Sequence, residues 1–515
     1  MILKKKIVEL IVQALTEAQQ KGLLPVMALP EIVVEHPQNP EHGDYATSLP
    51  LRLARGMGMN PLAIAEKIAS AFPSNPEIGK VEVAPPGFIN FTLSQAWLAQ
   101  QVEVILKQGE RFGNSDSGKG KKIQVEFVSV NPTGPLHVGH GRGAVLGSAL
   151  ANVLSAAGFS VEKEYYINDA GNQMDNFYRS LYARYMQALG KPAEMPAEGY
   201  VGTYMVELAQ TIVRDFGERF VTLPEDRAVK EIGPSGMERI VAALKRDLHS
   251  LGVEFDVWFS EKSLFEKGQY DKAMGLLRKG KYLEEREGAL WFTSTALGES
   301  KDNVVVRSIG TPTYFASDIA YHYNKFLERG FDQVIDIWGA DHQGHVSRMK
   351  AAVGALGVEP ERLKIIISQM VTLKRGEEVV RVSKRSGDLI TLKEVIDEVG
   401  PDACRFFFLS RSADSQMEFD LELAKKQSQD NPVYYVQYAH ARIASILRKA
   451  REGGYVWQDG TDTTALLTST HELALIRMML QLSEVIENIS ATLEAHHLPY
   501  YATELATIFH LFYKH

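Results

Sequence analysis

Cysteine is almost absent from this chain, because Cys404 is the only one among 515 residues. An internal disulfide is therefore excluded, and so are zinc sites built from several thiolates, which fits a reducing cytosol. Apolar runs of about 18 residues are also missing, so no membrane span is expected. The start, "MILKKKIVELIVQAL", places a basic cluster before an apolar run, but Glu9 and Gln13 interrupt that run at helical spacing. It predicts an amphipathic surface helix and not a secretion signal.

An excess of positive charge is missing too. The chain has 64 acidic and 56 basic side chains, a formal net charge of -8. Nucleic-acid binding therefore finds no support in the overall charge, and must rest on local patches. With 45% hydrophobic residues there is enough apolar material for buried cores, and the length suggests about three domains.

Strand and helix patterns alternate over most of the chain. Residues 1–112 predict a small α/β domain, which contains the strand-like "KVEVAPPGFINFTL". From 121 to 405 the order of strand "KIQVEFVSV", helix "GAVLGSALANVLSAAG" and strand "VEKEYYIND" begins a doubly wound parallel sheet. A helical, charged interval at about 172–280 predicts an insertion into it. Residues 406–515 predict an all-α bundle. The fold class is thus α/β, a Rossmann-type catalytic domain between two smaller domains.

One short stretch, "VNPTGPLHVGHGRGAVLG", holds a His-x-x-His pair among glycines where a strand gives way to a helix. His137 and His140 would share one face of the first helical turn, at the helix end that attracts phosphate. Gly139, Gly141 and Gly143 would let a base or ribose approach the backbone. These features fit a nucleoside triphosphate. Taken alone, such a pair is more often a surface or metal-adjacent accident than an ATP site. No third metal ligand lies nearby, so no metal site is predicted.

A second stretch, "TPTYFASDIAYHYNKF", offers groups suited to a guanidinium. Pro312 can open a helix in which Tyr314 and Asp318, at i and i+4, share one face. A carboxylate would pair with the cation while a phenol fixes its plane. The spacing alone favours a core tyrosine and a solvated acid.

The string "VEFVSVNPTGPLHVGHGRG" closely resembles the HIGH signature of class I aminoacyl-tRNA synthetases, in the form used by arginyl-tRNA synthetases. "RVSKRSGDLITL" is similar to the KMSKS loop, although Arg381 and Val382 replace its first lysine and its methionine. The resemblance implies a catalytic set and an ATP-binding set. The catalytic residues would be His137, His140, Lys384 and Arg385, and those binding ATP would be His137, Gly139, His140, Gly141, Asp341, Ser383 and Lys384.

The resemblance also implies where arginine binds. Tyr314 and Asp318 would hold the guanidinium, and "IDIWGADHQGHVSRMKAA" would bring Asp341 and His342 to the ribose and the substrate ammonium. His342 stands where many relatives carry glutamine. "YYINDAGNQM" would shape the pocket. The full arginine-binding set is Glu126, Ser129, Asn131, His140, Tyr314, Asp318 and His342.

The flanking domains resemble the tRNA-binding parts of the same family. For the N-terminal domain, the resemblance implies contact with the outer corner of tRNA. "DNPVYYVQYAHARIASILRKA" is similar to the first helix of the anticodon-binding bundle, where Tyr434, Tyr438 and Arg442 would contact tRNA. Tyrosines at this spacing are also typical of a helix core. Because family members continue past "ATIFHLFYKH", we expect the bundle to be incomplete.

The resemblance therefore implies an arginine–tRNA ligase that uses ATP and Mg²⁺, binds L-arginine and tRNA(Arg), and acts as a cytoplasmic monomer. Two alternatives stay open from the residues. A small-molecule adenylyltransferase shares the His-x-x-His turn but needs no flanking domains of this kind. A catalytically silent tRNA-binding paralogue would keep those domains, but should lack Lys384 or the histidines. A cysteinyl enzyme is disfavoured, since one cysteine cannot supply its zinc site.

Overall fold

The computed structural model describes residues 3–380, 390–455 and 464–515. These residues form two compact units, each assembled from separate parts of the chain. The first comprises Met1–Ser115, Val436–Asn488 and Tyr501–His515, and the second Asp116–Tyr435 and Ile489–Tyr500. They are described separately.

A five-stranded parallel sheet forms the centre of the second unit, in the order β11-β10-β4-β5-β6. The strands are β4 (Lys122–Glu126), β5 (Ser160–Ile167), β6 (Val257–Ser260), β10 (Gln333–Gly339) and β11 (Leu363–Ser368). The chain proceeds from β4 to one side of the sheet and later from β10 to the other, which confirms the predicted doubly wound topology.

Helix α5 (Val138–Ala156) connects β4 to β5 and is apolar on almost every side, as a helix buried on all faces must be. Gly147 explains how closely it approaches the sheet. A Cβ at this position would lie 2.1 Å from the ring of Phe127, so only glycine lets that ring pack on the helix. The middle of α5 thereby packs against the residue that follows β4.

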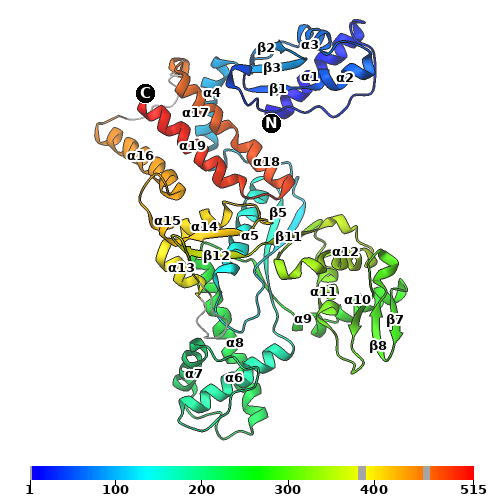
Figure 1. Cartoon of the computed structure of the whole chain (residues 1–515), viewed down its shortest axis with the longest axis vertical. Coiled ribbons are helices and arrows are strands. Elements are labelled where there is room, and N and C mark those ends of the chain that lie inside the picture. Colours follow the sequence, from blue (N-terminus) through cyan, green and yellow to red (C-terminus); the bar gives the residue numbers. More distant parts are fainter. Residues whose placement is uncertain (1–2, 381–389, 456–463) are drawn as a thin grey trace. The chain divides into compact units, whose positions relative to one another are not determined.

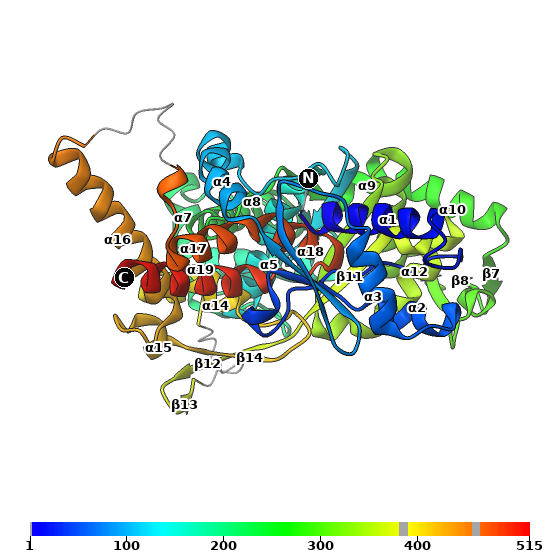
Figure 2. The same cartoon turned by 90° about the horizontal axis from the view of Figure 1, so that it is seen from above.

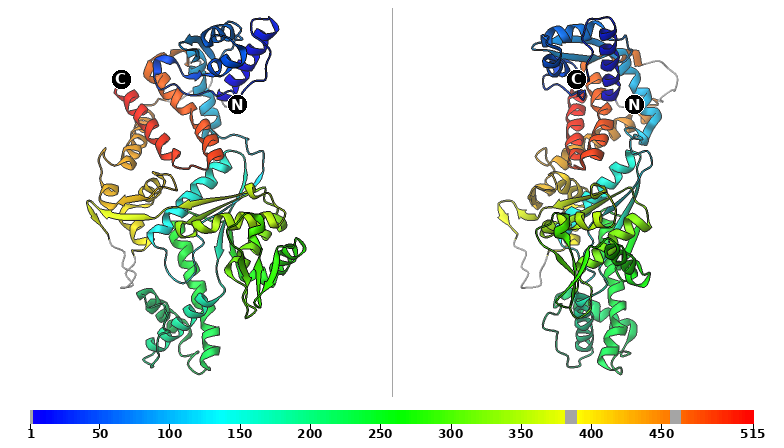
Figure 3. Two further views of the ribbon diagram at one scale, coloured as in Figure 1. Left: turned by 45° about the vertical axis from the view of Figure 1, so that its right-hand side comes forward. Right: turned by 90° about the vertical axis from the view of Figure 1, so that its right-hand side faces the viewer.

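The interval predicted as a helical insertion contains three long helices and one strand of the main sheet. Helices α6 (Asn172–Ala188), α7 (Thr203–Phe216) and α8 (Glu225–Ser250) pack together (Figure 1), and they stay grouped in both views of Figure 3. Strand β6 then pairs in parallel with β5. The insertion between β5 and β6 therefore ends before residue 257, earlier than the sequence pattern indicated.

Two small sheets flank the parallel one. Strands β7 (Leu283–Arg286), β8 (Ala289–Phe292) and β9 (Asn303–Val306) form an antiparallel sheet, which shares a core with the neighbouring helices. These helices are α9 (Lys262–Glu266), α10 (Gln269–Lys279), α11 (Tyr314–Tyr323) and α12 (Val346–Ala355). Strands β12 (Val371–Arg375), β13 (Glu378–Val379) and β14 (Met417–Asp420) form the other sheet, drawn as a narrow ribbon in Figure 2. Helices α13 (Leu392–Val399), α14 (Pro401–Leu409) and α15 (Leu421–Lys425) accompany it.

The first unit joins the beginning of the chain to its end. Its antiparallel sheet has the order β1-β3-β2, from β1 (Tyr45–Thr47), β2 (Ile78–Ala84) and β3 (Phe88–Leu93). Its helices are α1 (Leu3–Gln20), α2 (Leu49–Met57), α3 (Pro61–Ser70), α4 (Gln95–Gln108) and α17 (Thr470–Leu480). Helices α16 (Pro432–Glu452), α18 (Leu482–Thr492) and α19 (His497–Lys514) belong to it in part.

Residues from both ends of the chain share one hydrophobic core in this unit. Leu473 and Ile476 of α17 are buried with Ile7 and Phe91 of the N-terminal part. In both units, no helix among the described residues is long and apolar enough to cross a membrane.

Candidate active site

The largest hollow near the predicted residues lies where the sheet order changes direction, between the carboxyl ends of β4 and β10. Ligands bind at such a switch point in doubly wound sheets, because neighbouring loops diverge there. The cleft has a volume of about 980 Å³. It is lined by Ser129, Asn131, His140, Asp341 and His342 of the predicted set, and by residues of α7 and α13, among others.

His137 and His140 form the start of α5. His137 is the N-cap residue, and its Nδ1 accepts from the backbone N–H of Gly139 at 3.1 Å. His140 Nδ1 accepts from the backbone N–H of His137 at 3.3 Å, so the pair closes a capping box. The two rings stack with centroids 3.5 Å apart. The histidines are thus held by the helix end itself.

These hydrogen bonds fix which nitrogen of each ring carries the proton. Because Nδ1 of both rings accepts, the neutral rings must carry their proton on Nε2. Burial lowers the pKa of His140 to about 3, and the neighbouring His137 contributes to the shift. His140 is therefore neutral at physiological pH and acts as a hydrogen-bond donor, not as a cation.

The glycines of this turn have different surroundings. Gly143 has open space where a Cβ would stand, as expected for close approach to a ligand. At Gly141, however, a Cβ would lie 2.6 Å from Leu392 and 3.0 Å from Phe408. Gly141 thus allows α5 to pack on α13 and α14, a reason that the sequence did not indicate. At Gly139 the nearest neighbour is the ring of His137.

The backbone turns sharply where β4 ends. Val128 and Ser129 have φ angles of 69° and 44°, in the left-handed region that a β-branched residue such as valine rarely adopts. The turn lets the Ser129 hydroxyl donate to Glu126 at 2.8 Å and accept from the N–H of Tyr166 at 3.1 Å. Ser129, which lines the cleft, is thereby hydrogen-bonded to strands β4 and β5 of the sheet.

Glu126 is already paired within the protein. Its carboxylate contacts the ammonium of Lys325 at 2.6 Å, and Lys325, fully buried, also binds Asp336 at 2.8 Å. Burial alone would lower the pKa of Lys325, but the two carboxylates outweigh this effect and raise it. Burial raises the pKa of Glu126. Glu126 therefore supports Ser129, and its contact with a ligand would be indirect.

Two tyrosine phenols hold the loop that carries Asn131. Tyr165 donates to the carbonyl of Val130 at 2.9 Å, and Tyr204 of α7 donates to that of Thr133 at 2.8 Å. The side-chain amide of Asn131 contacts Gln173 of α6. Helices α6 and α7 of the insertion thus contact the loop that carries Asn131.

The second signature borders the same cleft. Leu392 N–H donates to the carbonyl of Leu136 at 2.7 Å, next to a bridge between Thr391 and His137. Thr391 and Glu394 cap α13 and line the cleft together with Ile390. Ser383, Lys384 and Arg385 lie outside the described residues. On the opposite side, Asp341 and His342 follow β10 and are well exposed, with their polar atoms 3.6 Å apart.

Tyr314 and Asp318 lie on α11, outside the residues that line the main cleft. Tyr314 is half-exposed and lines a smaller cavity of about 290 Å³ with Glu261, Gly171 and Arg307. The Asp318 carboxylate, one turn further, has a pKa raised to about 7 by burial, with further contributions from Glu126 and Glu261. Because no basic side chain of the described residues forms an ion pair with it, this carboxylate is suited to receive a cation from outside.

The predicted tRNA-contacting residues lie on α16. The guanidinium of Arg442 lies over the ring of Tyr438 at 4.4 Å and over that of Tyr513 at 4.7 Å. Tyr438 and His440 are exposed, whereas Tyr434 and Tyr435 are half-buried. Tyr438 and Arg442 thus present an aromatic and a cation together at the surface.

Sequence reasoning missed several residues of the site. Glu261 directly follows β6, whose β-rich "VWFS" was hidden inside an interval interpreted as helical. Thr391 and Glu394 have the Thr-x-x-Glu spacing of a capping box, which was visible in the sequence. Tyr204 had no such signal, because its partner Thr133 lies 71 positions earlier.

The sequence matches three family descriptions along its length. Residues 5–93 match the arginyl tRNA synthetase N terminal domain, and residues 436–515 match the DALR anticodon binding domain. Residues 101–407, more than half of the chain, match the catalytic domain of tRNA synthetases class I (R). The chain belongs to the arginyl-tRNA synthetase family.

Individual relatives agree with this assignment. The arginine–tRNA ligase of Dehalococcoides mccartyi is 58% identical over 99% of this chain and 92% of its own length. That of Heliobacterium modesticaldum is 48% identical over 100% and 92%. The solved Thermus thermophilus arginyl-tRNA synthetase, at 22% identity, supports the fold with a TM-score of 0.75 over 100% of this chain and 92% of that one.

Family membership decides between the functions left open by the sequence. The chain is a class I aminoacyl-tRNA synthetase with arginine–tRNA ligase relatives along its whole length. Its ligands are accordingly ATP, arginine and tRNA, and the alternatives of a silent paralogue and of a small-molecule adenylyltransferase find no support.

Proposed function

We propose that the cleft beside His140 activates L-arginine with ATP and passes the arginyl group to tRNA(Arg) for protein synthesis. The observation that carries this proposal is the neutral His140 at the start of α5, whose Nδ1 accepts from the backbone so that its Nε2 carries the proton, and which lines a cleft with Ser129, Asn131, Asp341 and His342. A preorganised neutral donor at a helix N-terminus is suited to a phosphate, because it needs no rearrangement as negative charge grows.

Activation requires alignment more than proton transfer. The arginine carboxylate is ionised at neutral pH and attacks the α-phosphate of ATP in line, and pyrophosphate leaves. His137 and His140 would donate to the phosphate oxygens, with Gly139, Gly143 and Asp341 at the adenosine. The leaving pyrophosphate would be bound by Lys384, Arg385 and Ser383. The carboxylates of Asp341 and Glu394 at the cleft are of the oxygen type that Mg²⁺ accepts, and the ion would screen the phosphate charge.

Selection of arginine would rest on the acidic side chains of Asp318 and Glu261. Asp318 and Glu261 are buried carboxylates with raised pKa values, and Tyr314 stands beside Glu261. A guanidinium would lower the cost of ionising both acids, and its planar fork offers more donors than an ammonium. Ser129, Asn131 and His342 would bind the α-ammonium and carboxylate, with Glu126 behind Ser129.

The second step would take place on tRNA. By its family, the chain transfers the acyl group to the terminal adenosine, and we propose that activation requires bound tRNA. The domain at 1–112 would contact the outer corner of tRNA, and 406–515 would contact the anticodon with Tyr434, Tyr438 and Arg442. The domain at 121–405 would hold the chemistry. We further propose a monomer that acts in the cytoplasm.

The proposal is tested by ATP–pyrophosphate exchange with each of the twenty amino acids, with and without unfractionated tRNA. Exchange with arginine alone, appearing only when tRNA is added, is expected. Exchange with a different amino acid would overturn the assignment of the pocket. Exchange with arginine in the absence of tRNA would contradict the proposed requirement for tRNA, but not the assignment of arginine as the substrate.

The role of Lys384 has its own test. Lys384→Ala should lower the activation rate much more than it weakens arginine binding, because the contact would form only as pyrophosphate leaves. Equal effects on the rate and on binding would argue against a transition-state role.

A further inference from the structure

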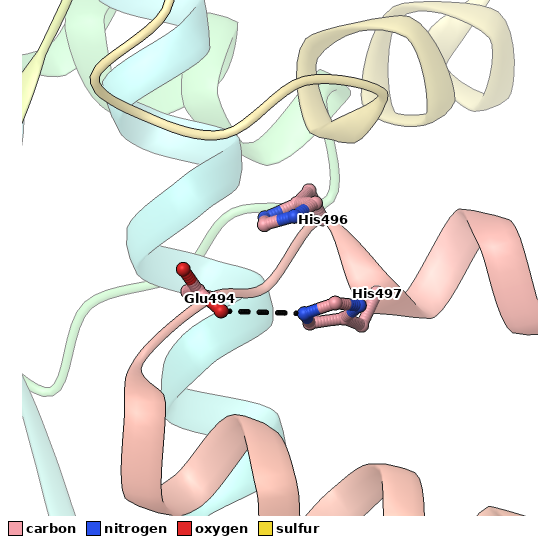
Figure 4. A group of neighbouring side chains, drawn as sticks. All are labelled: Glu494, His496 and His497. Carbon is pink, nitrogen blue, oxygen red and sulfur yellow. Dashed lines mark hydrogen bonds and ion pairs between the residues drawn. The ribbon is translucent and has the colours of Figure 1, made fainter. Parts of the chain in front are cut away.

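Three potential metal ligands meet in the turn between α18 and α19, where the sequence had indicated no metal site. Figure 4 shows Glu494, His496 and His497 with their side chains pointing toward one another. One ligand atom from each lies within 4.8 Å of those of the other two. The three belong to the same compact unit as the parallel sheet, but none of them lines the cleft of His140.

The backbone of the turn determines this arrangement. Leu493 adopts φ 64° and its N–H donates to Ile489 O at 2.7 Å, which ends α18. His497 then begins α19, and its N–H donates to the carbonyl of Glu494 at 3.3 Å. Since His496 and His497 stand on either side of the helix start, their rings stack, with centroids 4.4 Å apart. Neighbours inside a helix would diverge.

Tyr500, one turn into α19, supports both rings. It meets the rings of His496 and His497 edge-on, with centroids 5.6 and 6.4 Å away. Its phenol donates to the carbonyl of Ser410 at 2.9 Å, which fixes the tyrosine in turn. Groups that orient the ligating side chains from behind are typical of metal sites.

The distance between the ligand atoms of Glu494 and His497 fits a small tetrahedral ion. His497 Nε2 and Glu494 Oε2 lie 3.3 Å apart. This is close to the ligand–ligand edge of a tetrahedron with bonds of about 2.0–2.1 Å, the lengths of zinc–imidazole and zinc–carboxylate bonds. The ligand atom of His496 lies within 4.8 Å of both, and its ring would turn toward them when the ion binds all three.

Space for a fourth ligand lies beside the cluster. A cavity of about 390 Å³ is lined by Glu494, His496 and Asp414, among others. A water molecule can occupy the remaining position from this side. Two imidazoles, one carboxylate and an open position form a ligand set that suits zinc and not magnesium or calcium.

We propose that Glu494, His496 and His497 bind a divalent transition-metal ion of the zinc type, which fixes the turn between α18 and α19. The site is separate from the ATP cleft and needs no part of the proposed function. Its ion would be structural: it would join the end of one helix to the start of the next.

The test uses the full-length protein without a polyhistidine tag, freed of metal by a chelator and then dialysed. Zn²⁺ binding is measured by calorimetry, and Co²⁺ binding by the visible absorption of the tetrahedral ion. Glu494→Gln and His497→Gln are the variants. His249→Gln is the matched control, because His249 forms an exposed pair with Glu254 in the same unit. Circular dichroism of each protein establishes that it is folded.

One tight Zn²⁺ per chain is expected in the original protein and in His249→Gln, with a tetrahedral Co²⁺ spectrum. Each of the two ligand variants should bind more than about 10-fold more weakly and lose that spectrum. Zn²⁺ affinity that is unchanged in both variants would place the ion elsewhere, for example at the active-site histidines, and would overturn the proposal. Absence of a tetrahedral Co²⁺ spectrum in the original protein would overturn it as well.

Discussion

At the scale of single residues, Asp318 would combine a role in arginine binding with a cost in stability. Burial raises its pKa from 3.8 to about 7, so near neutral pH the folded protein holds a carboxylate that resists ionisation. Bound arginine would relieve this cost. The pH dependence of arginine use should therefore reveal the residue.

We expect kcat/KM for arginine to fall as the pH drops below about 7, because the carboxylate that pairs with the guanidinium becomes protonated. Asp318→Asn should raise the arginine KM by the equivalent of about 2–5 kcal/mol and flatten that acidic limb. Steady-state kinetics between pH 6 and 8.5, roughly one unit or more to each side of the relevant pKa, measure both effects. Unchanged arginine saturation would remove Asp318 from the pocket.

The same variant should be more stable without arginine. A group whose pKa is raised on folding destabilises the native state as the pH rises through that pKa. Asp318→Asn should therefore melt at a higher temperature than the original protein at pH values above about 7, with the difference vanishing in acid. A lower melting temperature at high pH would show that the amide is poorly accommodated.

His140 should affect stability in the opposite pH range. Its pKa falls from 6.5 to about 3 on folding, so stability is lost as the pH drops from about 6.5 toward 3. In His140→Asn the amide oxygen can still accept from the N–H of His137, while the titrating group is removed. The difference in unfolding free energy between the two proteins should shrink from pH 7 to pH 5, measured with urea. A constant difference would contradict the neutral, buried imidazole.

At the scale of elements, one buried arginine joins the signature helix to the strands around the second signature. Arg142 of α5 is fully buried and donates to the carbonyls of Gln369, Ser412 and Ser415 at 2.7–2.9 Å. Arg142→Met would leave these carbonyls without their donor and should cost about 3–5 kcal/mol of stability by urea unfolding. The exposed Arg411, replaced in the same way, is the control. A small loss would mean that water replaces the guanidinium.

Elements were also the scale at which the sequence was most informative. Local signals located α5, β4 and β5, because alternating and β-rich residues mark the two strands and the glycines at both ends mark the helix. Strand β6 was missed, since four residues of strand between long helices carry little periodicity. The pairing of Lys325 with Glu126 was equally invisible, because 199 positions separate the partners and only the sheet brings them together.

For the whole molecule, Glu484 connects the two ends of the chain within the first unit. Its carboxylate accepts from Tyr45 at 2.7 Å, and it contacts His36 at 2.9 Å and Lys4 at 3.0 Å. Burial would raise its pKa, but these partners outweigh burial and lower it. Its stabilisation is therefore present above the ordinary glutamate pKa and lost as the pH falls below it.

Glu484→Gln should accordingly destabilise the protein by about 1.5–3 kcal/mol at pH 7, measured by urea unfolding, and by much less near pH 4. Glu487→Gln, which removes a more exposed pair with Lys5, is the control and should change stability less. An equal loss at both pH values would point to packing and not to charge.

The discontinuous first unit has a consequence for how the protein is made. Residues 1–115 leave the ribosome before Leu473 and Ile476, which complete their hydrophobic core and are synthesised more than 350 positions later. The strands of the catalytic sheet lie between residue 115 and Leu473 in the chain. This sheet can fold while part of the apolar surface of the N-terminal segment is still uncovered. The N-terminal segment is thus completed only after the sheet that follows it in the chain, and over that interval its uncovered apolar surface would need protection by chaperones.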